Sequence, residues 1–306
     1  MPKWFLYCTI SLLMWAAWSL LSPLASKDLS GPMIQIISSA GLLPVALGMF
    51  LSPGVWQGTN RKKGTLLAVA TGVLGGGGNV LVYEALSHGG PASYVFPISS
   101  MCPLIPVLAA PFLFGERLRR PQVLGIGIAL VAIVLLNTTP AESSVGGPAA
   151  LISSWMMYTL LALFVFGITF LTQKSATYYI SDELSTIGFA CGFLLLDVYL
   201  LLAGKGIVWP VPTRAGLISL LIGVTMGFGS LTLFAAYRRG KASIISPYSQ
   251  LFPVITVLVA VPVYNEKLDM LRGIGVVAAL TSGVLLSMEK AEAETLAAPA
   301  AVAASD

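Results

Sequence analysis

The chain has 306 residues, of which 56% are hydrophobic and 10% are charged. Soluble domains carry roughly 25% charged residues, so this composition excludes an ordinary soluble globular protein and indicates a membrane protein. The formal net charge of +4 could suggest nucleic-acid binding, but the placement of the basic residues between helices explains it better, and we predict no nucleic-acid partner.

Apolar windows long enough to cross a bilayer recur along the chain. A membrane-spanning helix needs roughly 20 apolar residues, because each residue advances the helix by about 1.5 Å. We therefore expect an all-α membrane protein with ten transmembrane helices, at 4–24, 32–52, 64–86, 92–114, 121–137, 151–173, 183–203, 215–237, 242–264 and 271–288. The first window could be taken for a signal peptide, but Leu24-Ala25-Ser26 is a poor cleavage site, so we expect it to be retained.

The same stretch of sequence occurs twice. Residues 92–125 recur at 242–275 with a constant offset of 150, so that Glu116 pairs with Glu266, and upstream of Gly90 the offset becomes 151. Each copy holds an odd number of predicted spans, and two such copies must be inverted relative to each other. Inverted repeats of this kind are typical of secondary transporters.

The repeat divides the chain into two predicted five-helix units, 4–137 and 151–288. Between them, 138–150 is rich in helix-breaking and small polar residues and is predicted to be an exposed linker. Residues 289–306 turn to alanine and glutamate, and we expect a disordered cytoplasmic tail.

The basic residues predict an orientation. If the N-terminus is cytoplasmic, twelve of the 17 Lys and Arg residues fall in inner segments and five in outer segments. This bias follows the positive-inside rule and supports an even number of spans with both termini in the cytoplasm.

Prolines in the fourth and ninth windows indicate a substrate site. Pro103 and Pro253 lie near mid-window, and each is expected to leave the carbonyl four residues earlier without a donor. Such carbonyls are tolerated at membrane depth where protein, water or a ligand satisfies them, which predicts a hydrated central cavity. The alternative is that the prolines only kink helices for packing, with serine hydroxyls repairing the backbone. The predicted substrate-binding residues are these two prolines and a set of aromatic and uncharged polar residues: Trp15, Asn79, Tyr83, Ser99, Ser100, Ser249 and Gln250.

A glycine cluster in the third window is mirrored in the eighth. The first cluster comprises Gly72, Gly75, Gly76, Gly77 and Gly78, and the second comprises Gly223, Gly227 and Gly229. Small residues at three- and four-residue spacing let membrane helices approach closely, so we predict tight packing or a bend. A nucleotide-binding loop would require a preceding strand and a following Gly-Lys-Ser/Thr, and neither is present in the sequence.

Asp197 is a carboxylate deep in an unbroken apolar run. Desolvation disfavours the charged form of a buried carboxylate, which can then exchange a proton near neutral pH, as a proton-coupled carrier requires. Asp197 also lies about 10 Å from the outer end of its window, close enough to reach interfacial water. The sequence leaves both the proton-coupling role and the solvated role open. His88 is the only histidine, and we predict neither a metal site nor a cofactor.

Several of these motifs together resemble the drug/metabolite transporter superfamily, in particular its EamA-type members with two EamA repeats. The resemblance rests most on Phe114-Gly115-Glu116-Arg117-Leu118 and Tyr264-Asn265-Glu266-Lys267-Leu268, and further on Trp15-Ala16, Phe166-Gly167, Tyr83-x-Ala85-Leu86 and Phe234-x-Ala236-Tyr237. The sequence departs from the family pattern at Asn265, where glycine is usual. The resemblance implies a ten-helix carrier of the cell inner membrane, commonly an exporter of amino acids, metabolites or drugs.

We therefore expect a secondary active transporter that moves a small molecule by alternating access, driven by a proton or substrate gradient. A channel for small neutral solutes is the alternative, although the sequence shows no ring of identical charged residues. An enzyme is not expected, because the sequence shows no nucleophile with a base, paired aspartates or His-Glu-x-x-His. The lipid bilayer and a small-molecule substrate are the expected partners, and the sequence leaves a homodimer open.

Overall fold

The computed structural model describes residues 3–105, 108, 120–137, 153–204, 206–239, 245, 248–249, 251–266 and 269–286. The predicted linker at 138–150, the predicted tail at 289–306 and the predicted site residue Gln250 lie outside this part of the chain. The first half contains α1 (Lys3–Ala25), α2 (Gly31–Gly48), the short η1 (Met49–Leu51), α3 (Arg61–Ser87), α4 (Ala92–Ser99) and α6 (Arg120–Asn137). The second half contains α7 (Ser154–Thr177), α8 (Asp182–Ala203), α9 (Thr213–Arg239), α11 (Phe252–Tyr264) and α12 (Met270–Leu286).

The prediction of an all-α protein is confirmed, since the described residues form helices and turns with one isolated bridge between Gly58 and Ile180. Within the described ranges, six helices are long and apolar enough to cross a membrane: Lys3–Ala25, Gly31–Leu51, Arg61–Ser87, Ser154–Thr177, Asp182–Ala203 and Thr213–Ala236. Three shorter apolar helices cover Arg120–Leu136, Phe252–Tyr264 and Gly273–Leu285.

The predicted windows at 92–114 and 242–264 do not form single described helices. The helix α4 ends at Ser99, and turns follow through Pro103. The helix α11 begins only at Phe252, which places Pro253 in its first turn. Proline is tolerated there because the first N–H groups of a helix have no internal partner. The prediction that Pro253 interrupts a helix interior is therefore wrong.

Glycines bring two pairs of helices into backbone contact. A Cβ added to Gly72 on α3 would meet the Phe189 carbonyl and lie 2.8 Å from the Cα of Gly192 on α8. A Cβ added to Gly223 on α9 would meet the Ser38 carbonyl on α2, and one added to Gly41 would meet the Leu220 carbonyl. The prediction of tight packing at Gly72 and Gly223 is confirmed. The offset of 151 relates Gly72 to Gly223 and Gly41 to Gly192, so the same close contact occurs twice.

Contacts along α3 give the directions of its neighbours. Gly72 faces Gly192 and Gly76 faces Leu196, so α3 and α8 run parallel. Gly78 faces Phe166 whereas Gly75 faces Thr169, so α3 and α7 run antiparallel.

Contacts along α9 give the matching result in the other half. Gly41 meets Leu220 and Val45 meets Gly227, so α2 and α9 run parallel. Ser11 Oγ donates to the Gly229 carbonyl at 2.9 Å while Cys8 packs with Leu233, so α1 and α9 run antiparallel.

The two halves therefore use their helices in opposite senses. The N-terminus of α2 meets the C-terminal end of α3, where Gly31 N donates to Glu84 Oε1 at 2.9 Å, so α2 and α3 run antiparallel. With the contacts above, α1, α3 and α8 point one way, and α2, α7 and α9 point the other way. Each of the first three helices thus runs opposite to its counterpart 151 residues later.

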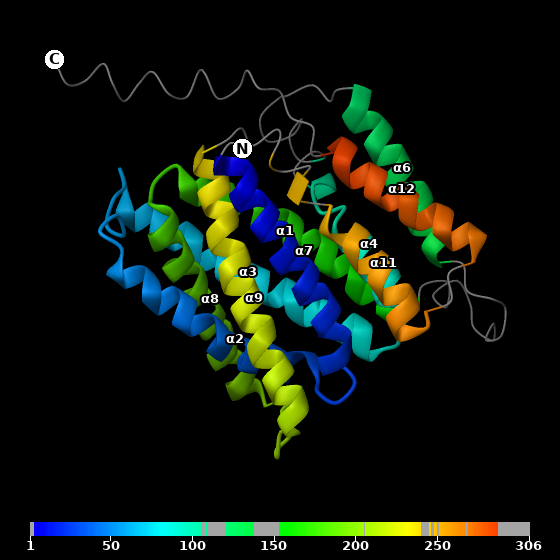
Figure 1. Cartoon of the computed structure of the whole chain (residues 1–306), viewed down its shortest axis with the longest axis horizontal. Coiled ribbons are helices and arrows are strands. Elements are labelled where there is room, and N and C mark those ends of the chain that lie inside the picture. Colours follow the sequence, from blue (N-terminus) through cyan, green and yellow to red (C-terminus); the bar gives the residue numbers. More distant parts are fainter. Residues whose placement is uncertain are drawn as a thin grey trace.

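Figure 1 shows how the helices are grouped. The helices α6 and α12 lie side by side at one end of the molecule, and α2 and α8 lie at the other. Between them, α3 packs on α7 and α1 packs on α9, while α4 and α11 face each other. The cavity described below lies within this central group and is also lined by Phe189 of α8.

Candidate substrate cavity

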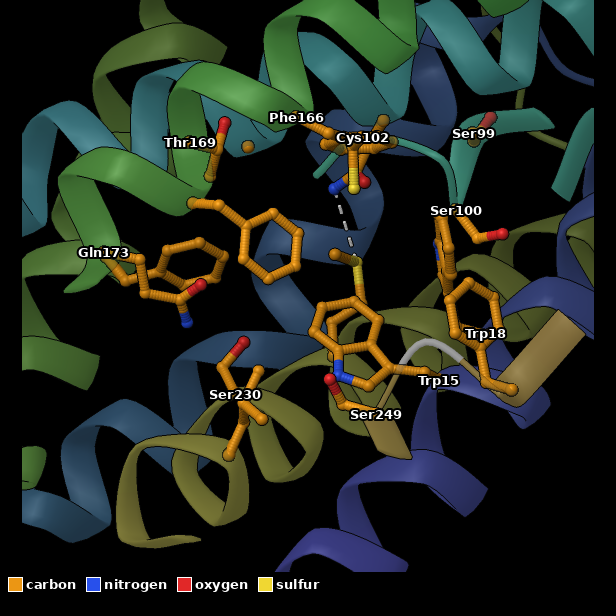
Figure 2. A pocket seen from close by; sticks show the side chains of 17 residues that line it. Trp15, Trp18, Ser99, Ser100, Cys102, Phe166, Thr169, Gln173, Ser230 and Ser249 are labelled. Atoms are coloured by element: carbon orange, nitrogen blue, oxygen red, sulfur yellow. Dashed lines mark hydrogen bonds between the residues drawn. The ribbon is translucent and has the colours of Figure 1, made fainter. Parts of the chain in front are cut away.

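A cavity lies among α1, α3, α4, α7, α8, α9 and α11. It holds about 750 Å³ of empty space, part of it open to solvent. Figure 2 shows Trp15 near the middle of the view, with Gln173 and Thr169 on one side and Ser99, Ser100 and Trp18 on the other. The lining residues are Trp15, Trp18, Gly75, Asn79, Ser99, Ser100, Cys102, Phe166, Thr169, Phe170, Gln173, Phe189, Met226, Ser230, Leu233, Ser249 and Phe252.

The cavity combines aromatic rings with uncharged polar groups. Its rings come from α1, α7, α8 and α11, and its hydroxyl and amide groups come from α3, α7, α9 and the segments around Ser99 and Ser249. Among the described lining residues, none carries a charge at neutral pH. Such a surface suits an uncharged or zwitterionic solute with an apolar body, because a net charge would be desolvated without a partner.

Five of the predicted site residues line this cavity: Trp15, Asn79, Ser99, Ser100 and Ser249. Tyr83, Pro103 and Pro253 do not. Tyr83 is fully buried, and its hydroxyl accepts from Trp18 Nε1 at 3.0 Å, so it supports a cavity residue from behind. Asn79 donates through Nδ2 to the sulfur of Met226 at 3.5 Å, a weak bond that leaves its amide available to a ligand.

The turn after α4 positions the two serines. Ser99 Oγ donates to the Val95 carbonyl at 2.7 Å, and Ser100 Oγ donates to the Pro97 carbonyl at 2.7 Å. Each hydroxyl oxygen keeps acceptor capacity beside the cavity. The carbonyl of Ser99 accepts from Cys102 N at 3.2 Å, because the chain turns there and does not continue as an α-helix. The prediction that Pro103 leaves this carbonyl unpaired is wrong.

Sequence reasoning placed the sixth and eighth predicted helices, which are α7 and α9, at the cavity but named none of their residues as site residues. The ring of Phe166 and the polar side chains of Thr169, Gln173 and Ser230 line the cavity, and none of them was among the predicted site residues. The repeat offset would have found several of them. Six repeat-related pairs account for twelve lining residues: Trp15 with Phe166, Trp18 with Thr169, Gly75 with Met226, Asn79 with Ser230, Ser99 with Ser249, and Cys102 with Phe252. The cavity thus lies where the two repeats meet.

Asp197 lies outside the cavity. It faces α2 from α8, and only 5% of its surface is exposed. Of the two roles that the sequence leaves open, this low exposure favours the buried carboxylate over the solvated one, and the coupling role stays a prediction.

Comparison with known proteins agrees with the geometry. The model of the EamA-like transporter family matches residues 2–138 and 153–288, one match for each half. The chain belongs to this family. Two strains of Helicobacter pylori have similar proteins named uncharacterized transporters, at 28% identity and 27% identity over 198 residues. These matches cover 62% of this chain, which spans 63% of the length of those curated relatives.

Two further matches cover very different lengths of the chain. An uncharacterized protein of Methanocaldococcus jannaschii is 36% identical over 70 residues, which are 23% of this chain and 51% of that protein. A solved crystal structure matches 92% of this chain and 94% of its own with a TM-score of 0.63 and 18% identity. At that identity the match shows a shared fold.

The motif copy that departs from the EamA pattern keeps its backbone conformation. Asn265 ends α11 with φ of 52°, in the left-handed region that glycine adopts without strain. Asparagine is, after glycine, the residue that best tolerates this conformation. The next residue, Glu266, accepts from Ala92 N at 2.7 Å and from Ser93 N at 2.9 Å, so it caps the N-terminus of α4 in the other repeat.

Proposed function

We propose that this EamA-family protein is a secondary active transporter of ten membrane-spanning helices, arranged as two inverted five-helix repeats that work by alternating access in the cell inner membrane. The observation that carries the proposal is the cavity built from repeat-related residue pairs, on helices that run in opposite senses. Such a site can be reached from either face by equivalent movements of the two halves.

The shape of the cavity supports a state open toward one face. Four lining residues, Phe170, Gln173, Phe189 and Leu233, extend it toward the end of the molecule where Arg61 and Arg239 lie. Their counterparts 151 residues earlier are Ser19, Ser22, Ser38 and Val82, which are all fully buried. The cavity therefore favours the face of Arg61 and Arg239, which the positive-inside rule assigns to the cytoplasm. This would be the loading state of an exporter.

Contacts at the opposite end support closure there. Trp18 Nε1 donates to the Tyr83 hydroxyl at 3.0 Å, on the side of the cavity that faces this end of the molecule. The counterpart pair is Thr169 and Phe234, which cannot form this bond because phenylalanine carries no hydroxyl. The Tyr264 hydroxyl also donates to the Leu20 carbonyl, and Glu266 caps the N-terminus of α4. Hydrogen bonds therefore connect the second repeat to the first at this end.

The lining indicates the class of substrate. Six aromatic residues provide stacking surfaces, and seven serine, threonine, asparagine and glutamine side chains provide neutral donors and acceptors. We propose a small neutral or zwitterionic solute with an apolar or aromatic part. An amino acid or a drug-like metabolite has this chemistry.

Flux into liposomes tests the proposal. Purified protein in liposomes should be offered radiolabelled amino acids, nucleosides, sugars and cationic drugs. We expect saturable uptake of a neutral or zwitterionic member, accelerated when unlabelled compound is preloaded inside. Flux that does not saturate and shows no counter-flow would instead indicate a channel, and the carrier proposal would fail.

Asn79→Leu should then reduce kcat/KM for the solute found by about fivefold to 150-fold, because loss of a hydrogen bond in a desolvated site costs about 1–3 kcal/mol. Leucine has a similar shape, so the fold is expected to be retained and can be checked by gel filtration. The matched control is Gly77→Ala on the same helix, where an added Cβ meets nothing within 4 Å. Equal activity of the two variants would remove Asn79 from the binding site.

A further inference from the structure

A second buried polar site lies between α2 and α8, away from the cavity. Its members are Gln35 and Ser39 on α2 and Asp197 on α8, with exposed fractions of 0%, 1% and 5%. None of the three lines the cavity. Asp197 is about 9 Å along α8 from its end at Ala203, and Gln35 is about one turn from the start of α2. The site thus lies near the ends of α2 and α8 that the positive-inside rule assigns to the outer face, and it is separate from the cavity.

The hydrogen bonds of this site leave two oxygens unsatisfied. Gln35 Nε2 donates to Ser39 Oγ at 3.2 Å, and Ser39 Oγ is 3.1 Å from the Gln35 carbonyl, to which it donates. The side chains of Ser39 and Gln35 also lie beside the carboxylate of Asp197. Even so, Asp197 Oδ1 and Gln35 Oε1 are buried without a partner. Two buried acceptors without hydrogen bonds lower the stability of the folded protein. A single proton bound to one oxygen and donated to the other would satisfy both of them.

No cation compensates this carboxylate among the described residues. The helix α2 carries no titratable group. On α3 the basic residues lie at its start, and Tyr83 and Glu84 lie near its other end, where Glu84 accepts from Gly31 N. On α9 the arginines are at the two ends, and Arg239 pairs with Asp182 at the start of α8. A negative charge on Asp197 would therefore be buried without an ion-pair partner.

We propose that Asp197 is a proton-binding site, and that the proton it takes up from outer-face water is held between Asp197 and Gln35. One proton adds to Oδ1, and the carboxyl group becomes neutral. The new O–H can donate to Gln35 Oε1 once the amide of Gln35 rotates, so both unsatisfied oxygens gain a partner. No other covalent bond forms or breaks, the rotation of the Gln35 amide breaks its hydrogen bond to Ser39 Oγ, and the release step is the reverse.

The site is placed to influence the cavity. A Cβ added to Gly76 on α3 would lie 3.3 Å from Gln35 Nε2, and the adjacent Gly75 lines the cavity. On the other side, Asp197 shares α8 with the lining residue Phe189. Proton binding at Asp197 and rotation of the Gln35 amide thus affect both α3 and α8, the two helices that meet at Gly72. This coupling step, unlike proton binding, rests on the proposed transport function.

The repeat has no second copy of this site. The offset of 151 relates Asp197 to Ala46, Gln35 to Thr186 and Ser39 to Ala190. The counterpart positions therefore carry no carboxylate. A proton site that is present in one repeat alone, near one face, would give the two directions of transport different proton dependence.

Infrared difference spectroscopy of the purified protein tests proton binding without any substrate. Between alkaline and acidic pH, a buried carboxyl group should show a C=O stretching band distinct from that of exposed carboxyls. We expect this band in the unaltered protein and in the matched control Asp28→Asn, whose carboxylate is exposed. The part of the band that comes from Asp197 should be lost in Asp197→Asn, whereas the part that comes from Asp182, which is 6% exposed, should remain. The Asp197 part should shift in frequency in Gln35→Leu, which removes the acceptor.

Three results would overturn the proposal: a band that is unchanged in Asp197→Asn, a band that is the same in Gln35→Leu as in the unaltered protein, or a carboxylate signal of Asp197 that responds to replacing KCl with NaCl at constant pH. The last result would assign a sodium ion to the site. If the band behaves as expected while no solute shows carrier kinetics, the proton site stands and the proposed transport function fails.

Discussion

Gly72→Ala is expected to destabilise the protein strongly, although it adds a single methyl group in the middle of a helix. The new Cβ would strike the Phe189 carbonyl and the backbone of Gly192, neither of which can move without shifting α8. Overpacking of this kind costs about 1–3 kcal/mol. The melting temperature in detergent should fall accordingly, with a loss of monodisperse protein on gel filtration.

The control for this change lies five residues further along α3. Gly77→Ala adds the same methyl group where nothing lies within 4 Å, so it should leave the melting temperature unchanged or raise it, because alanine favours a helix by about 1 kcal/mol over glycine. Gly223→Ala, at the repeat counterpart of Gly72, should behave like Gly72→Ala. Similar stability of Gly72→Ala and Gly77→Ala would contradict the close contact between α3 and α8.

Glu266→Gln should loosen the closed end of the molecule. The two carboxylate oxygens of Glu266 accept from the backbone N–H groups of Ala92 and Ser93 at the start of α4. Glutamine offers one acceptor and turns an N–H₂ group toward the second donor, and it also loses the favourable charge at a helix N-terminus. We expect a loss of about 2–4 kcal/mol of stability, measured by chemical unfolding in detergent.

Glu183→Gln is the matched control for Glu266→Gln. Glu183 accepts from Ser52 Oγ at 3.0 Å at the opposite end of the molecule, and a glutamine carbonyl can replace that single acceptor. Its substitution should cost at most about 1 kcal/mol. If the two substitutions cost the same, the contact of Glu266 with α4 does not hold the repeats together.

Much of the fold was predictable because it rests on properties of long stretches of sequence. Apolar length places the helices, and the constant offset between Glu116 and Glu266 reveals the repeat. The close contacts at Gly72 and Gly223 followed from side-chain size alone. These features can be predicted even when helix boundaries are wrong by several residues. They do not depend on how each helix is rotated about its own axis.

The cavity was predicted only in part, because which residues line it depends on the rotation of each helix about its axis and on local turns. Asn79 and Tyr83 are one turn apart on α3, yet one faces the cavity and the other supports Trp18. Pro253 looked like an interruption within a helix but lies in the first turn of one, because a turn closed by the bond from Leu251 N to the Tyr248 carbonyl precedes α11. Phe166 and Ser230 carried a usable signal, because each is the repeat counterpart of a residue already chosen.

Thiol labelling from each side of the membrane tests the central claim most directly, namely that inverted repeats enclose one cavity that opens alternately to the two faces. In a protein without its native cysteines, single cysteines should be placed at Gln173 and at its repeat counterpart Ser22. Each lies about one turn from the end of its helix, at Thr177 and Ala25. Only the first position lines the cavity.

We expect a membrane-impermeant thiol reagent to modify Gln173→Cys from the cytoplasmic side and to leave Ser22→Cys unmodified. Adding Glu266→Gln should reverse this pattern, exposing Ser22→Cys to the outer side and protecting Gln173→Cys. Modification of both cysteines from the same side, or of both at once in every background, would contradict alternating access between inverted repeats.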